Sequence, residues 1–212
     1  MSEIEYLFLD KIDYIKALKF QIDKVNEIKY GERKNYLIFL EHNDVITKGI
    51  RAKENEILVD KRILDSENIQ IIDTDRGGSL TAHGPGQLVI YTIFDLNRLR
   101  LNVRQFIDII CNSFILWLRK EGIISSFDSK HPGLYVNGKK ILSLGLKLDN
   151  HITYHGFALN INSIPKGFQF ILPCSMQNCQ MTSVSLETSK KYDIRKVSIE
   201  LYDLIRESFK QI

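Results

Sequence analysis

The sequence predicts an α+β fold in which helices pack against a mostly antiparallel sheet. Three stretches carry apolar residues at the spacing of amphipathic helices, and the segments between them are apolar runs of strand length. The pair Asn137-Gly138 lies between two such runs, and this pair is the strongest short signal for a β-hairpin. Hairpins pair their strands antiparallel, so the strands in the middle of the chain predict an antiparallel sheet and, with the helices, an α+β fold.

Each of the three helices begins or ends at a recognisable capping residue. The first follows Asp13 and runs to about Lys29, the second spans Val103 to Lys120 before Gly122, and the third follows Asp193. The residues expected on their buried sides are, in turn, Ile15, Leu18, Ile22 and Val25; Val103, Phe106, Ile107, Ile110, Phe114 and Leu118; and Ile194, Val197, Leu201, Leu204 and Ile205.

The strands are predicted from short apolar runs bounded by turn residues. A turn at Asp149-Asn150 joins the last two of them, so three consecutive strands form a meander. The expected strands are Tyr6–Leu9, Tyr36–Glu41, Ile69–Ile72, Leu88–Leu96, Leu134–Val136, Lys139–Leu148 and Ile152–Ile161. Without a linker or repeat, these elements predict a single domain over residues 1–212.

The composition excludes several classes of function. The 29 basic and 26 acidic residues give a formal charge of +3, too balanced for nucleic acid as the first expected partner. No stretch approaches the roughly 18 to 20 apolar residues of a membrane span. The acidic start lacks the features of a signal peptide, and three irregularly spaced cysteines favour a reducing compartment. We therefore expect a cytoplasmic protein that binds neither nucleic acid nor membrane.

The segment Arg76–Gln87 is the most unusual of the chain, because it holds four of the twelve glycines together with Pro85 and His83. Glycines let the backbone approach a ligand closely, so the segment could line a binding site. It could equally be a pair of tight turns between two strands. Its spacing matches neither a phosphate-binding P-loop nor a dinucleotide fingerprint.

A lysine heads the strand Lys139–Leu148. In a regular strand Lys140 shares one face with Leu142, Leu144, Leu146 and Leu148. Burial there would disfavour the charged ammonium and suit a proton acceptor. Alternatively, Lys140 lies at the strand end and its amine reaches water.

Cys174 follows Pro173, a residue that interrupts regular strands, so its thiol could be exposed at a sheet edge. A cysteine thiolate exchanges readily with thioesters, which makes it suited to acyl transfer. Most cysteines are core residues instead, and Cys111 beside the apolar stripe of the second helix is expected to be one. Cys179 is the alternative nucleophile. No second pair of ligands completes a zinc site with these two cysteines.

Taken together, these segments resemble the lipoyl(octanoyl) transferase family. Four groups of residues carry the resemblance, in the family's order and over about Glu41 to Val184. They are Glu41-His42 with Val45–Thr47 and Gly49; Arg76–Gly78 with His83–Gln87; Pro132-Gly133, Lys139–Ile141 and Ser143–Leu146, continuing into His155-Gly156 and Ala158–Asn160; and Pro173-Cys174 with Thr182-Ser183.

The resemblance implies the catalytic-domain fold of biotin and lipoate protein ligases, with Cys174 as the acyl-thioester cysteine and Lys140, not Lys139, as the lysine that activates it. It also implies an acyl site lined by Arg76, Gly77, Gly78, Ser79, Leu80, Thr81, Ala82, His83, Ser143, Leu144, Gly145, Gly156, Phe157 and Ala158.

The implied reaction moves octanoyl from octanoyl–acyl carrier protein, the donor, to a lysine of a lipoyl domain. The implied acceptors are the lipoyl domains of 2-oxoacid dehydrogenases and the H protein of glycine cleavage. Because a thioester is converted to an amide, neither ATP nor a metal is required and no cofactor is expected. Acyl carrier proteins are acidic, so a basic docking face is expected, with Arg98, Arg100 and Arg104 as candidates.

Two positions depart from the family pattern. Ala82 stands where an aromatic residue usually precedes the histidine, and its small side chain is expected to widen the acyl pocket. Ser175 replaces the usual glycine after the cysteine, and its side chain restricts the backbone at the nucleophile.

Three other functions fit parts of the sequence. An ATP-dependent lipoate or biotin ligase would share the fold and need no cysteine. A cysteine hydrolase would use Cys174 with His83 or His155 and release free acid. A non-catalytic module would bind acyl carrier protein without forming an adduct.

Overall fold

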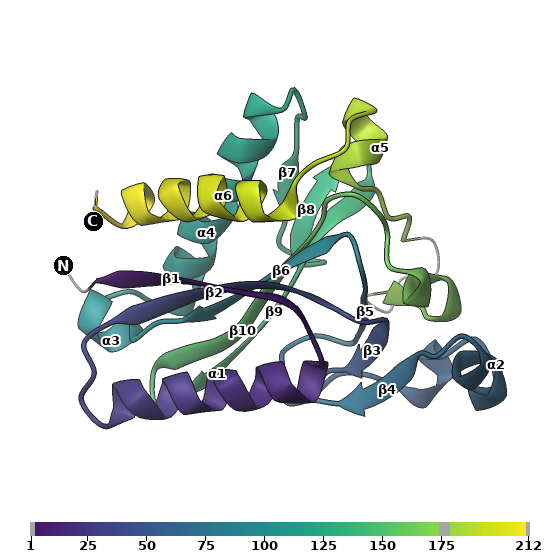
Figure 1. Ribbon diagram of the computed structural model, residues 1–212, viewed down its shortest axis with the longest axis horizontal. Helices are drawn as coiled ribbons and strands as arrows, with labels where there is room; N and C mark the ends of the chain where they lie inside the picture. Colours follow the sequence, from purple (N-terminus) through teal and green to yellow (C-terminus); the bar gives the residue numbers. More distant parts are fainter. Residues whose placement is uncertain (1–2, 174–178, 211–212) are drawn as a thin grey trace.

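The computed structural model describes residues 3–173 and 179–210, so Cys174 and Ser175 lie outside the described residues. Its main element is a seven-stranded sheet in the order β1-β2-β6-β10-β9-β8-β7 (Figure 1). The bounds are β1 Ile4–Ile12, β2 Asn35–His42, β6 Gln87–Ile93, β7 Ser126–Asp128, β8 Gly133–Val136, β9 Lys139–Asp149 and β10 Ile152–Asn160. Every neighbouring pair except β1–β2 is antiparallel, which confirms the predicted fold class.

The pair β1–β2 is parallel because helix α1 (Tyr14–Lys29) carries the chain back between the two strands. A separate three-stranded sheet has the order β4-β3-β5 and lies beyond the N-terminal end of α1, next to helix α2 (Figure 1). Its elements are β3 Val45–Lys48, α2 Lys61–Ser66, β4 Gln70–Asp73 and β5 Leu80–His83. The short strands β3, β5 and β7 were not predicted.

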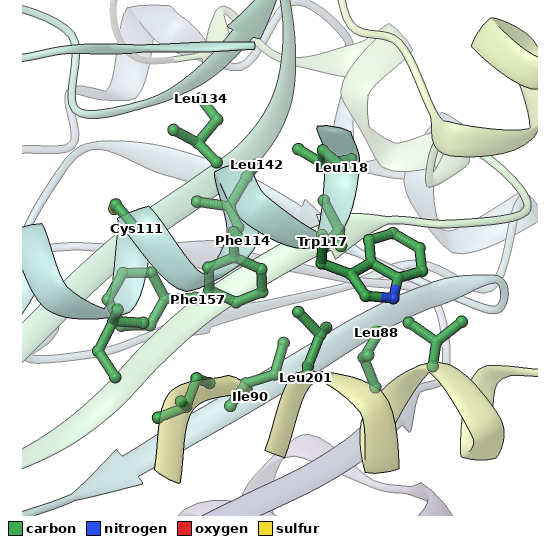
Figure 2. Packing of buried hydrophobic residues seen from close by; sticks show 14 of the residues in the cluster. Leu88, Ile90, Cys111, Phe114, Trp117, Leu118, Leu134, Leu142, Phe157 and Leu201 are labelled. Carbon is green, nitrogen blue, oxygen red and sulfur yellow. The ribbon is translucent and has the colours of Figure 1, made fainter. Parts of the chain in front are cut away.

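Helices α4 (Val103–Lys120) and α6 (Ile194–Lys210) cover one face of the large sheet, where Phe114, Trp117 and Leu201 pack against strand residues (Figure 2). Helix α4 has the predicted bounds, α6 begins after Asp193 as predicted, and Cys111 is buried in this core as expected. The remaining helical turns are α3 Leu96–Leu99, α5 Val184–Thr188 and the 3-10 turns η1 Glu54–Glu56 and η2 Lys166–Phe170. No helix in the described ranges is both long and apolar enough to cross a membrane.

Helix α1 covers the opposite face, but with a different side from the predicted one. Ile15 and Ile22, expected inward, are 53% and 38% exposed. The buried residues are Tyr14, Ala17, Gln21, Val25 and Ile28. The apolar pattern was misleading because Gln21 belongs to the buried side: its side-chain oxygen accepts a 2.8 Å hydrogen bond from the backbone N–H of His155.

The hairpin between β8 and β9 forms as predicted, with positive φ angles of 48° at Asn137 and 77° at Gly138. The strand after it is not regular. Tyr135 pairs with Lys140 whereas Leu134 pairs with Leu142, so Ile141 is an extra residue, a β-bulge. The bulge moves Lys140 off the leucine face: Leu142 joins the core beneath α4, and Lys140 faces the cavity on the other side. The predicted shared face of Lys140 and the leucines is therefore wrong.

Candidate active site

A cavity of about 50 Å³ lies where the glycine-rich segment meets strands β9 and β10. All of the predicted acyl-site residues border it except Gly77 and Ala82. Its lining is Tyr14, Arg76, Gly78, Ser79, Leu80, Thr81, His83, Val89, Tyr91, Lys140, Ser143, Leu144, Gly145, His155, Gly156, Phe157 and Ala158. Segments separated by many residues in the sequence thus meet around the same cavity.

Ala82 lies outside this space. Its methyl group is fully buried in the core of the small sheet, against Ile46 and facing Gly167. The cause is strand alternation in β5, which points Thr81 and His83 toward the cavity and Ala82 away from it. The expected widening of the acyl pocket by Ala82 is therefore not seen.

Arg76 holds the glycine-rich segment in place. Its guanidinium donates to the side-chain and backbone oxygens of Thr47 at 2.9 and 2.7 Å and to the carbonyl of Ser79 at 2.8 Å. The segment also contacts β9 directly, since the backbone N–H of Gly77 donates to the carbonyl of Leu146 at 3.0 Å. These bonds explain why Arg76 is buried although it is charged.

Two glycines shape the wall formed by the sheet. Gly145 of β9 and Gly156 of β10 are register partners. A Cβ atom at Gly145 would lie 2.6 Å from the carbonyl oxygen of Gly77, and one at Gly156 would overlap the carbonyl oxygen of Ile90. Gly145 therefore lets the glycine-rich segment approach β9, and Gly156 lets β6 and β10 pack closely beside the cavity.

Lys140 is 1% exposed, so its amine does not reach bulk water as the alternative prediction required. The amine donates a 2.9 Å hydrogen bond to the carbonyl oxygen of Pro132 and lies 5.5 Å from the centre of the Tyr135 ring. A Cβ atom at Gly133 would collide with the end of this side chain. The Pro132-Gly133 pair therefore provides both the hydrogen-bond acceptor and the space for the lysine.

The chain that follows Cys174 is tied to Lys140 through its backbone. The N–H of Lys140 donates to the carbonyl of Gln180 at 2.8 Å, and the N–H of Thr182 donates to the carbonyl of Lys140 at 2.9 Å. Met181 and Lys140 thus form a parallel β-bridge. This contact is made by described residues on the C-terminal side of the predicted nucleophile.

A chain of buried side chains connects the same segment with the glycine-rich segment. His83 Nδ1 lies 2.8 Å from the side-chain oxygen of Gln87. The Gln87 amide donates to Asn160 Oδ1 at 2.9 Å, and the Asn160 amide donates to the carbonyl of Thr182, also at 2.9 Å. Because every member is buried and bonded, the chain fixes the relative positions of the segments that carry the motifs.

Burial keeps the histidines of the site neutral. Desolvation lowers the pKa of His42 to about 4 and that of His83 to about 3. His42 bridges the carbonyl of Ile12 at 2.8 Å and the Tyr91 hydroxyl at 2.7 Å, and its ring lies 5.6 Å from that of His83. Burial also raises the pKa of Tyr14, whose ring stacks on His83, to about 12.

His155 adopts a left-handed backbone conformation, with φ at 57°. Its Nε2 lies 2.9 Å from Oδ1 of Asp75, whose other oxygen accepts from the Tyr154 hydroxyl. Burial lowers the pKa of His155 although Asp75 opposes this. The buried Nδ1 has no partner among the described residues. Nothing in the sequence distinguished Asp75, Tyr14 or Tyr91, because Asp75 lies in the loop after β4 and the two tyrosines hold ordinary helix and strand positions.

The predicted docking arginines do not border the cavity. Arg98 is committed elsewhere: its guanidinium donates to the carbonyl of Glu32 at 3.2 Å and forms an ion pair with Asp95 at 3.3 Å. Arg100, in a left-handed conformation, ends helix α3. The basic cluster read from the sequence is thus partly a structural feature of the α3 turn.

The fold is that of the lipoate and biotin protein ligases. Lipoate-protein ligase A bound with ATP has a TM-score of 0.74 at 16% identity, over 98% of this chain and 94% of that one. The putative lipoate protein ligase Ta0514 from T. acidophilum, with bound lipoic acid, has a TM-score of 0.73 at 15% identity, over 99% and 95%. For biotin protein ligase from Aquifex aeolicus with biotin and ATP the TM-score is 0.59 at 15% identity, over 100% and 72%.

The family described as the lipoyl protein ligase A/B catalytic domain matches residues 13–205, which defines the class of the chain. The octanoyltransferase of Alkaliphilus metalliredigens is 36% identical over 177 residues, 83% of this chain and 81% of that protein. The octanoyltransferase of Vesicomyosocius okutanii is 38% identical over 172 residues, 81% of each. The chain therefore belongs to the lipoyl(octanoyl) transferases, a family of acyltransferases.

Proposed function

We propose that the protein transfers an octanoyl group from octanoyl–acyl carrier protein, through a thioester on Cys174, to a lysine of a lipoyl domain. The observation that carries this proposal is the placement of Lys140. Its buried amine borders an apolar cavity, and its backbone is hydrogen-bonded to the chain that follows Cys174. A lysine in such a place can stabilise a thiolate electrostatically or accept its proton.

In the first half-reaction the Cys174 thiolate attacks the carbonyl carbon of the donor thioester. A new carbon–sulfur bond forms, the bond to the carrier sulfur breaks, and the carrier thiol leaves with a proton. The acyl tail enters the cavity, with Leu144, Phe157 and Ala158 as apolar walls.

In the second half-reaction the neutral amine of the target lysine attacks the Cys174 thioester. An amide bond forms, the carbon–sulfur bond breaks and the amine loses a proton, so the enzyme returns to its starting state. Conversion of a thioester to an amide is downhill, and this is why the proposal includes neither ATP nor a metal. The acceptors we propose are lipoyl domains of 2-oxoacid dehydrogenases and the H protein of glycine cleavage.

Intact-mass spectrometry after mixing the protein with octanoyl–acyl carrier protein, without ATP, tests this proposal. We expect one octanoyl adduct that hydroxylamine removes. Cys174→Ser should abolish it, whereas the matched variants Cys111→Ser and Cys179→Ser should keep it. Addition of a lipoyl domain should then move the mass onto its lysine.

Two results would contradict the proposal. Acylation of the domain from free octanoate only when ATP is present would indicate an ATP-dependent ligase on the same fold. Release of octanoate to water with no acylated domain would indicate a hydrolase.

A further inference from the structure

Half of strand β9 has an open edge. Strand β8 pairs with β9 only as far as Ser143, while β9 continues to Asp149 and pairs with β10 along its other edge. Gly77 donates to the carbonyl of Leu146 on the open side. Since backbone groups alternate along a strand, those of Leu144 and Leu148 point to this side too. The pairing of Ser143 with Gly133 still engages the N–H of Leu144, whereas no described strand pairs with Leu148 on the open side.

This edge borders a groove that we call the edge groove. Its apolar wall consists of Leu144, Leu146 and Leu148 of β9 and Val103 and Ile107 of α4. It is continuous with the acyl cavity, because Gly78, Ser79, Leu144 and Gly145 line both. From Leu144 to Leu148 the groove extends about 13 Å along the strand.

Basic side chains from two distant segments border the same groove. Arg51 and Lys53 come from the loop after β3, and Lys130 and His131 from the turn before β8. Arg51, Lys53 and Lys130 are exposed and, among the residues that the structure describes, none of the three forms an ion pair. No carboxylate lines the edge groove. Its chemistry is therefore an apolar wall, free backbone donors and acceptors, and a positive rim.

We propose that the edge groove binds the phosphodiester-linked pantetheine arm of the acyl donor, with its acidic carrier protein docked on Arg51, Lys53 and Lys130. This inference rests on the proposed function and adds the donor's binding surface. Such an arm is extended, contains two amides and ends in a phosphate. The amides match the open edge of β9, and the phosphate and the acidic protein match the cations. The acceptor's lysine side chain is too short to need a groove of this length.

The test compares two triple variants with the same change in charge. Arg51→Glu, Lys53→Glu and Lys130→Glu reverse the rim, whereas Lys19→Glu, Lys120→Glu and Lys196→Glu reverse exposed lysines on α1, α4 and α6. Each protein is assayed with octanoyl–acyl carrier protein and with octanoyl-pantetheine, which has the amides but neither phosphate nor protein. The KM for the lipoyl domain is measured in parallel.

We expect the rim variant to raise the KM for octanoyl–acyl carrier protein at least tenfold and to weaken its dependence on salt. Its kcat/KM with octanoyl-pantetheine should stay within about twofold of the unaltered protein, as should all parameters of the control variant. Octanoyl-N-acetylcysteamine, which keeps only one amide, should be a poorer donor than octanoyl-pantetheine.

Three results would overturn the inference: an unchanged KM for the carrier protein, a raised KM for the lipoyl domain alone, or an equal loss with octanoyl-pantetheine. The second would assign the groove to the acceptor, and the third would mean that the charges act on the cavity. If the unaltered protein transfers nothing from either thioester, the proposed function fails instead, and this result is distinguishable from the other three.

Discussion

The amine of Lys140 lies 2.9 Å from the carbonyl oxygen of Pro132, and this hydrogen bond fixes the end of a side chain that is 1% exposed. A lysine side chain is seldom buried in this way, because an amine that loses contact with water loses its hydration. Its backbone is bonded to the chain that follows Cys174, and this position supports the catalytic role that we propose for it.

Replacing Lys140 with methionine should therefore slow transfer while the fold is kept. Methionine has a similar length and no charge, so we expect a decrease in kcat of about 10²- to 10⁴-fold. Lys139→Met, at the neighbouring exposed position, is the matched control and should change kcat by less than twofold. If Lys140 acts only by making the thiolate, the residual rate of Lys140→Met should rise with pH. A residual rate independent of pH would exclude that role, and an unchanged kcat would exclude any role in catalysis.

Two glycine substitutions should separate stability from activity. Gly156→Ala places a methyl group onto the backbone of the neighbouring strand β6, which cannot move easily, so the free energy of unfolding should fall by about 1–3 kcal/mol or more. Gly145→Ala meets the backbone carbonyl of Gly77 at 2.6 Å and would push the glycine-rich segment away from β9, at the wall of the cavity. We expect this variant to lose less stability but more of its transfer rate. Chemical denaturation and single-turnover assays check both, and equal effects at the two positions would contradict the assignment.

The buried chain from His83 to Thr182 should be sensitive to a change of one atom. In Asn160→Asp the donor to the Thr182 carbonyl is lost, and a carboxylate faces an acceptor. The free energy of unfolding should decrease by about 1–3 kcal/mol, and kcat should fall because the chain after Cys174 loses an anchor. Asn43→Asp, at an exposed position, is the control. A kcat unchanged in Asn160→Asp would show that this anchor does not position the reacting groups.

The buried histidines predict loss of stability in mild acid. The pKa values of His42, about 4, and His83, about 3, lie below the unfolded value of about 6.5. Between these values the unfolded chain binds protons that the folded protein does not, so stability falls as the pH falls from about 6.5 toward 4. Each histidine contributes a slope of about 1.4 kcal/mol per pH unit in this range. Urea unfolding at pH 7.5, 6 and 5 measures it, and His83→Gln should flatten the dependence.

Local signals in the sequence were sufficient for several elements of the fold. Spacing and capping residues predicted the bounds of α4 and the start of α6, and Asn137-Gly138 predicted the hairpin, because these features depend on neighbours within a few residues. These local signals were misleading where contacts between distant residues decide which side of a helix is buried. The buried side of α1 includes Gln21, whose partner is the backbone of His155, more than a hundred residues away.

The sequence by itself determined which residue types were available for the chemistry: the glycine-rich segment, the lysine, and, through the resemblance, their expected roles. Only the tertiary structure decided their arrangement. The bulge at Ile141 turned Lys140 into the cavity, and alternation in β5 turned Ala82 out of it. The open edge of β9 exists because β8 begins at Gly133, opposite Ser143. Such features depend on how strands pair across the sheet, and a periodicity read along one strand contains no information about its partner.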